Sequence, residues 1–146
     1  MSANLKAAKA GMTPDVFSDD SIDLELPKNP VWVSVARLAA AAIAYRAGMP
    51  FDTIEDIKVI VAEAVSYAIQ YGAPQGRLHL RFDLSHDHLD ITLTDPTFPL
   101  KLPRDRNGAS YKTFVDGLFL IRGLADEVDF DATPGGGLAL RIRRGA

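Results

Sequence analysis

The stretch FDTIEDIKVIVAEAVSYAIQY, residues 51–71, decides the fold of this chain of 146 residues. Its apolar residues recur at spacings of three and four, which is the pattern of a helix with one buried face. They are Ile54, Ile57, Val61, Ala64, Val65 and Ala68. Asp52 is followed three residues later by Glu55, as in a capping box, so the helix is expected to begin near Thr53. We expect its apolar face to pack on a β-sheet.

Glu63 interrupts this run away from the apolar face, on a second stripe with Val59, Ile60, Ser66 and Tyr67. On that stripe its carboxylate would point toward an edge of the core, where a cleft or a partner could lie. A single glutamate on the flank of a helix is most often only solvated. The stretch alone therefore leaves its role open.

Composition limits the class of protein. With 47% hydrophobic residues, the chain fits one globular domain, and a net charge of −3 disfavours a nucleic-acid partner. There is no cysteine, which excludes disulfides and thiolate metal sites. The apolar run 38–45 is too short to span a bilayer, and residues 1–11 contain no signal-peptide core. We expect a cytoplasmic protein that does not enter a membrane.

The first part of the chain divides into a tail and the start of the domain. Residues 1–20 show no periodicity and are expected to form a flexible tail, so the domain should occupy residues 21–146. Residues 21–26 alternate as a strand. Asn29 followed by Pro30 predicts a capped helix that ends at Gly48.

This first helix is apolar nearly all round. One face is expected to lie on the sheet, and its row of alanines would allow the close approach of another element or of another subunit. The alternative is a helix that is wholly buried inside the monomer. If the surface binds a partner, Arg37 would be its polar residue.

Further strands are predicted at 77–84 and 89–94, where apolar and polar residues alternate, and these two should form an antiparallel hairpin. We expect His86 and His88 to be part of a solvated turn and not a metal site. Residues 95–112 are predicted to be a long loop with a binding role.

A helix over 113–125 and a closing hairpin of 127–131 with 138–143 complete the order of elements. The pattern predicts a two-layer α/β sandwich, a mostly antiparallel sheet with helices on one face. The expected core is Leu24, Val35, Leu38, Ile57, Val61, Ala64, Leu78, Leu80, Phe82, Ile91, Leu93, Leu118, Ile121, Leu140 and Ile142.

Four stretches carry a family resemblance: LPKNPVWVSVARL, FDTIEDIKVIVAEAVSYAI, LDITLTDPT and DGLFLIRGLADEV. In this order, they make the chain resemble the GHKL ATPases, and most of all the RsbW-type anti-sigma factor serine kinases, from about Ser21 to Arg144. The resemblance implies the Bergerat-type fold of histidine-kinase-like ATPases. It also implies an ATP site with a bound Mg²⁺.

The resemblance assigns the residues of that site, and several depart from the family pattern. Glu63 matches the glutamate that polarises a hydroxyl or water, but Tyr67 stands where the family has the asparagine that binds Mg²⁺. Asp95 matches the aspartate that accepts from the adenine amino group. Thr97 replaces the glycine that lets the backbone lie close to the ring.

The phosphate-binding turn departs from the pattern as well. Where the family has Gly-x-Gly-Leu, this chain has Val115, Asp116, Gly117 and Leu118, so a negative charge stands beside the expected phosphates. The Gly-Thr that usually opens the last strand is Gly137-Leu138. These departures predict that Mg-ATP binds weakly or not at all.

Three functions follow as hypotheses. The first is an anti-sigma-like regulator that binds a sigma factor, an anti-anti-sigma protein of the STAS class, or both, through a surface that the resemblance places around Trp32, Arg37 and Ala40. The expected state of this regulator is a homodimer. The second is an active serine kinase with Glu63 as base. The third is a sensor that uses the same cleft for another small ligand.

Overall fold

The computed structural model describes residues 20–98, 118–134 and 137–146. Its elements in chain order are β1 (Ser21–Pro27), the 3-10 helix η2 (Pro30–Trp32), α2 (Val33–Arg46), α3 (Phe51–Tyr71), β2 (Arg77–Leu84), β3 (His88–Asp95), α5 (Phe119–Leu124), β4 (Glu127–Ala132) and β5 (Leu138–Gly145). The expected tail therefore lies outside the described residues, except for Asp20.

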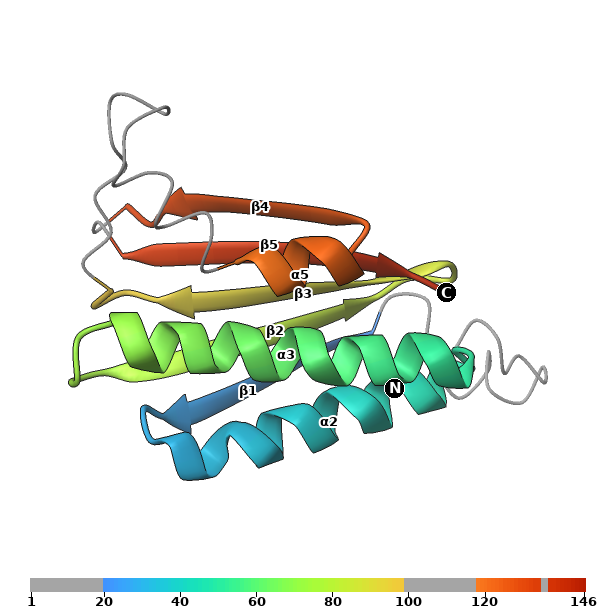
Figure 1. The fold of residues 1–146 in the computed structure, drawn as a ribbon, viewed down its shortest axis with the longest axis horizontal. Helices are drawn as coiled ribbons and strands as arrows, with labels where there is room; N and C mark the ends of the chain where they lie inside the picture. The colour runs from blue at the N-terminus through green and yellow to red at the C-terminus, as the bar shows by residue number, and fades with distance from the viewer. Residues whose placement is uncertain (1–19, 99–117, 135–136) are drawn as a thin grey trace, which may run out of the picture.

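The described strands form a five-stranded sheet in the order β1-β2-β3-β5-β4, and every pairing in it is antiparallel. The helices lie on one face of this sheet (Figure 1). The predicted hairpin is present, with Leu80 opposite Leu93. The two-layer sandwich predicted from the alternation is confirmed.

Alternation along the strands builds the core, because every second side chain points toward the helices. Twelve of the fifteen expected core residues are buried. They are Ile57, Val61, Ala64, Leu78, Leu80, Phe82, Ile91, Leu93, Leu118, Ile121, Leu140 and Ile142. Helix α3 lies over the middle of the sheet, so Ile60 and Tyr67 are buried as well.

The prediction for α2 was wrong at two core positions. Val35 and Leu38 are exposed, and Leu24 on the edge strand β1 is only partly buried. The reason is that α2 packs chiefly against α3, with Ala36 and Ala40 turned inward. The small residues of α2 therefore allow α3 to pack closely against it, and the larger apolar residues of α2 face outward.

The helix starts follow the local signals in one case and not in the other. The side chain of Asn29 accepts a hydrogen bond from the amide of Val31, as predicted for a cap. Helix α3 begins at Phe51 with Pro50 as its N-cap residue, so the expectation of a capping Asp52 was wrong. Asp52 lies in the first turn, where its charge still favours the helix N-terminus.

Within the described ranges, no helix combines the length and the apolar character needed to cross a membrane. Helix α5 occupies only part of the predicted helix 113–125, and residues 113–117 lie outside the described residues.

Candidate functional site

Asp95 is the last inward-facing residue of β3. The inward row of this strand is Leu89, Ile91, Leu93 and Asp95, all of them buried. The alternation that builds the core therefore also carries a carboxylate into it. A buried carboxylate needs compensating partners, because burial without them costs several kcal/mol.

Lys28 supplies the compensating charge. Its Nζ lies 2.8 Å from Asp95 Oδ2, and the two side chains are 2% and 0% exposed. Sheet pairing explains this meeting: Pro27 pairs with Arg77, and His79 pairs with Thr94, so the ends of β1 and β3 lie at the same end of the sheet with β2 between them. The long lysine side chain spans that width.

The other oxygen of Asp95 is bonded within its own loop. Oδ1 accepts a hydrogen bond from the Thr97 amide at 3.1 Å, and the Thr97 hydroxyl lies 3.0 Å from it. That hydroxyl also accepts from Lys28 Nζ at 2.6 Å and lies 2.9 Å from the Gln75 carbonyl. Its single proton can serve only one of the two acceptors at a time. Both carboxylate oxygens are thus engaged by the chain itself.

The contact between Lys28 and Oδ2 is an ion pair and not a well-directed hydrogen bond, since Oδ2 receives none. Lys28 still compensates the carboxylate charge, because attraction between opposite charges at this separation depends little on angle. Lys28 completes its coordination with the Ala73 carbonyl at 2.9 Å. Its ammonium group thus has three close oxygen neighbours for three donors.

An aromatic cluster lies beside this network. The Tyr67 ring is 4.9 Å from that of Tyr71 and stacks on Phe98 at 6.1 Å. Burial raises the pKa of Tyr67 to about 12, and Tyr71 adds to the shift. Tyr67 is therefore a neutral phenol at physiological pH, which makes it a poor ligand for a metal cation.

Two glycines allow the backbone to close around the site. A side chain at Gly72 would meet the Asp95 carboxylate at 3.0 Å and the Phe98 ring at 3.1 Å. A side chain at Gly137 would collide with the backbone of Asp95 and Pro96. The end of β3 is thus packed closely from two sides.

A family model described as the histidine kinase-like ATPase domain matches residues 26–144. The serine-protein kinase RsbW of Listeria innocua is 32% identical over 123 residues, which make up 75% of this chain and 78% of the relative. RsbW of Halalkalibacterium halodurans is 33% identical over 136 residues, covering 86% of this chain and 84% of the relative. The chain belongs to the RsbW-type histidine kinase-like ATPases.

Solved structures share the fold. The RsbU and RsbW domains of a Mycobacterium tuberculosis protein match with a TM-score of 0.65 at 14% identity, over 86% of this chain and 32% of that one. The SiaB–SiaC complex from Pseudomonas aeruginosa matches with a TM-score of 0.53 at 14% identity, over 97% of this chain and 98% of that one. This RsbW-type chain thus spans about a third of the first neighbour.

The RsbW-type motif residues are only partly brought together. Asp95 and Thr97 are hydrogen-bonded directly to each other. Phe98 stacks on Tyr67, and its amide donates to the Asp95 carbonyl at 3.1 Å. Glu63 is exposed on α3. Leu118 is buried where α5 begins, whereas Asp116 and Gly117 lie outside the described residues.

Sequence reasoning about this RsbW-type site missed Lys28 and the aromatic partners Tyr71 and Phe98. Lys28 stands in the Pro-Lys-Asn-Pro break after β1, which we interpreted only as the end of a strand and the start of a helix. No local pattern points from it to Asp95. A buried carboxylate at the end of an apolar strand was the available signal, because it requires a cation somewhere in the fold.

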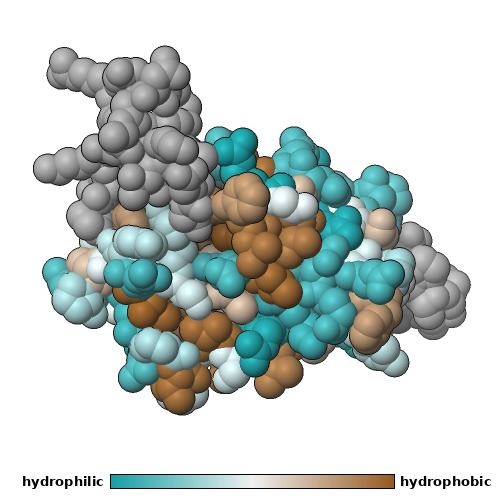
Figure 2. All heavy atoms as spheres, viewed as in Figure 1, coloured by the Kyte–Doolittle hydropathy of each residue, from teal (hydrophilic) through white to brown (hydrophobic). Residues whose placement is uncertain are grey.

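The residues expected at the partner surface differ in exposure. Trp32 is exposed and Arg37 is half-buried, but Ala40 is fully buried against the rest of the monomer, so it offers no surface to a partner. An exposed apolar row runs along η2 and α2 instead, at spacings of four, three, four and three: Val31, Val35, Leu38, Ala42 and Tyr45. We call it the α2 stripe. Figure 2 shows apolar surface over α2 and over α5.

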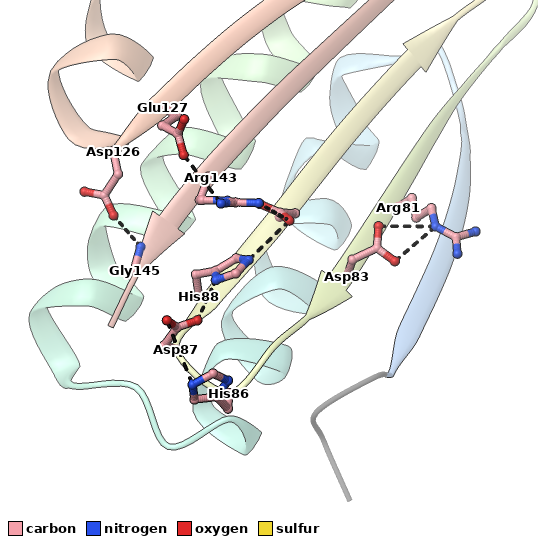
Figure 3. Close-up of polar contacts among 10 residues, drawn as sticks. Arg81, Asp83, His86, Asp87, His88, Asp126, Glu127, Arg143 and Gly145 are labelled. Atoms are coloured by element: carbon pink, nitrogen blue, oxygen red, sulfur yellow. Dashed lines mark hydrogen bonds and ion pairs between the residues drawn. The ribbon is translucent and has the colours of Figure 1, made fainter. Parts of the chain in front are cut away.

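The histidine turn of this RsbW-type chain is polar, as expected. His88 Nδ1 lies 2.6 Å from Asp87 Oδ1, and this hydrogen bond lowers the pKa of Asp87 (Figure 3). His86 lies 4.0 Å from the same carboxylate. Among the described residues, no group of three or more His, Cys, Asp or Glu side chains is arranged to hold a metal ion.

Proposed function

We propose that this chain is an anti-sigma-type regulator that acts by binding a protein partner, a sigma factor or an anti-anti-sigma protein of the STAS class, and that Mg-ATP binds to it weakly or not at all. Membership of the RsbW-type family supports the class of function. The internal bonding of Asp95 supports the loss of nucleotide binding.

The single observation that carries the proposal is the engagement of both Asp95 oxygens by Lys28 and Thr97. By resemblance, this carboxylate should accept from the adenine amino group. A neutral amino group would have to displace an ammonium group, and charge-assisted contacts are roughly twice as strong as neutral ones. The base therefore competes poorly with a cation that belongs to the protein.

Tyr67 supports the same conclusion from the metal side. A phenol with a pKa of about 12 does not offer the charged or carbonyl oxygen that Mg²⁺ prefers. Its ring is also fixed between Tyr71 and Phe98. The residues present at these positions do not fit a family-type Mg-ATP site.

Calorimetric titration with ATP and Mg²⁺ tests this part. The unmodified chain is expected to show no saturable binding below about 1 mM nucleotide. Tyr67→Asn alone should improve the affinity only partly, and Lys28→Met with Tyr67→Asn should improve it further, since each change removes one obstacle. Tight Mg-dependent binding by the unmodified chain would refute the proposal.

The partner surface that we propose is the α2 stripe, and in the absence of another protein we propose that it pairs with a second copy. The spacing of four and three is that of the seam in a two-helix interface, and Leu38 in its middle is 61% exposed. A two-fold dimer would bury the same stripe on both copies.

Light scattering on Leu38→Glu, with Phe119→Glu as the matched control, tests the surface. Both residues are exposed and apolar, but Phe119 lies on α5, away from the stripe. The unmodified chain and the control are expected to have the mass of two chains, and Leu38→Glu that of one. A dimer that survives Leu38→Glu would exclude the stripe. Pairwise mixing with the sigma factors and STAS proteins of the source organism then identifies the partner.

An active serine kinase is the second candidate. It is favoured by the exposure of Glu63, which makes no hydrogen bond or ion pair in the described part of the chain, and by similarity to relatives named serine-protein kinase RsbW. Incubation of a bound STAS protein with radiolabelled ATP separates the two. Transfer of phosphate that is lost in Glu63→Gln would establish the kinase.

A further inference from the structure

We propose that Lys28 links the ancestral base-binding site to the start of the partner-binding helix, so that anything that takes Asp95 from Lys28 loosens the N-terminal end of α2. This inference rests on the proposed function and deepens it, because it states how the cleft would influence the α2 stripe. Lys28 is a positioning residue in this proposal, since it would act through the helix that follows it.

The first step is the position of Lys28 in the chain. It directly follows β1, which ends at Pro27, and precedes Asn29, the cap of η2. The amide of Asn29 donates to the Pro27 carbonyl at 2.9 Å, and that of Trp32 to the Asn29 carbonyl at 3.0 Å. The residue that pairs with Asp95 is thus joined by a short, hydrogen-bonded turn to the helix that carries the stripe.

The second step is what Lys28 holds at its other end. Its ammonium group contacts Ala73 in the turn after α3, Thr97 in the loop after β3, and Asp95 itself. Through these contacts, Lys28 connects the turn after α3 and the loop after β3, including Asp95, to the start of η2. No strand pairing makes this connection directly. Because both charges of the pair are buried, the arrangement is rigid and costly to break on one side only.

A ligand at this site would compete with Lys28 for Asp95. A ligand that donates to Asp95 Oδ2 must replace the ammonium group, which then has to leave a site where its side chain is 2% exposed. The displaced lysine can reach solvent only if its backbone or side chain moves, and its backbone is the turn before η2. The ligand class that can compete is one with a cationic amino or amidine group, since only such a group restores the charge balance around Asp95.

Hydrogen exchange measured by mass spectrometry tests the link on the full chain. The variants are Lys28→Met and the double variant Lys28→Met with Asp95→Asn, which leaves neither charge buried. The matched control is Arg77→Met, which removes an exposed ion pair between Arg77 of β2 and Glu25 of β1. Relative to the amides of β2, we expect those of residues 29–38 to exchange about tenfold faster in both Lys28 variants and to be unchanged in the control.

The double variant keeps the test decisive if Lys28→Met alone does not fold. Unchanged exchange over 29–38 in a folded double variant would overturn the inference, as would acceleration confined to residues 93–98. Acceleration over residues 29–38 that does not exceed the acceleration in β2 would also overturn it, because it would indicate only the general loss of stability that follows when Asp95 loses its cation.

Chemical complementation gives a second measurement. In Lys28→Ala, methylammonium chloride is expected to slow exchange over 29–38 toward the wild-type rate, whereas sodium chloride at the same concentration should not. No difference between the two salts would contradict the role of the ammonium group. The outcome is separate from that of the nucleotide titration: tight ATP binding would refute the proposed function, whereas these exchange rates test the link alone.

Discussion

Asp90 and Asp95 lie on the same strand, and each is paired with a cation at nearly the same distance. Arg143 Nε is 2.7 Å from Asp90, and Lys28 Nζ is 2.8 Å from Asp95. The first pair lies on the open face of the sheet, with side chains 45% and 33% exposed. Figure 3 shows Arg143 on this face, beside Glu127. The second pair lies between the sheet and the helices, with almost no exposure.

The difference shows that contact distance alone does not indicate what an ion pair does. Water screens the pair on the open face, and Arg143 also has Glu127 at 3.6 Å, so losing one partner leaves its charge solvated. In the buried pair, the loss of one partner leaves a charge without water or a counter-ion. The loss of one partner is therefore expected to cost more stability in the buried pair than in the surface pair.

The largest effect is expected for Lys28→Met, which should lower the free energy of unfolding by about 3–5 kcal/mol because the Asp95 carboxylate stays buried without its cation. Urea denaturation followed by circular dichroism measures it. The double variant with Asp95→Asn should recover part of the loss. A cost below about 1 kcal/mol would place this pair in the same class as the surface pairs.

Gly137→Ala comes next, with an expected loss of about 1–3 kcal/mol, because the new methyl group would collide with the backbone at the end of β3. Gly123→Ala is the matched control, since nothing lies within 4 Å of its added carbon. The control should be neutral or slightly stabilising, as it removes a glycine from a helix. Equal melting temperatures for the two variants would contradict the close packing.

Tyr67 is a buried group whose ionisation should reduce stability at high pH. Its pKa is raised to about 12 by burial, from a usual value near 10, so the stability that depends on its neutral form is complete below pH 10 and lost as the pH rises toward 12. Unfolding of the wild type should therefore become easier than that of Tyr67→Phe by about 1 kcal/mol at pH 11. Parallel curves from pH 8 to about 11 would argue against a buried phenol.

The smallest effect is expected for Arg143→Met on the open face. Its melting temperature should stay close to that of the wild type, and any difference should disappear in about 0.5 M sodium chloride, where charges on the surface are screened. A large loss that persists in salt would mean that the open face is covered, for instance by another protein.

Much of the fold could be predicted because it depends on local patterns. The strand 77–84 and the hairpin it forms follow from simple alternation, and the cap at Asn29 follows from one dipeptide. The orientation of α2 could not be predicted, because a helix that is apolar on every side gives no signal of which side is buried. Val35 and Leu38 were misplaced for this reason.

The sequence by itself determined that this chain is a two-layer sandwich of the RsbW type and that Tyr67 stands where a metal ligand is expected. Only the tertiary structure decided that Asp95, predicted at the start of a loop, is the buried last residue of β3, that Lys28 pairs with it, and that Ala36 and Ala40 of α2 turn inward. The physical reason is that periodicity fixes which side of an element is buried, whereas partners far apart in the chain are selected by strand pairing and packing.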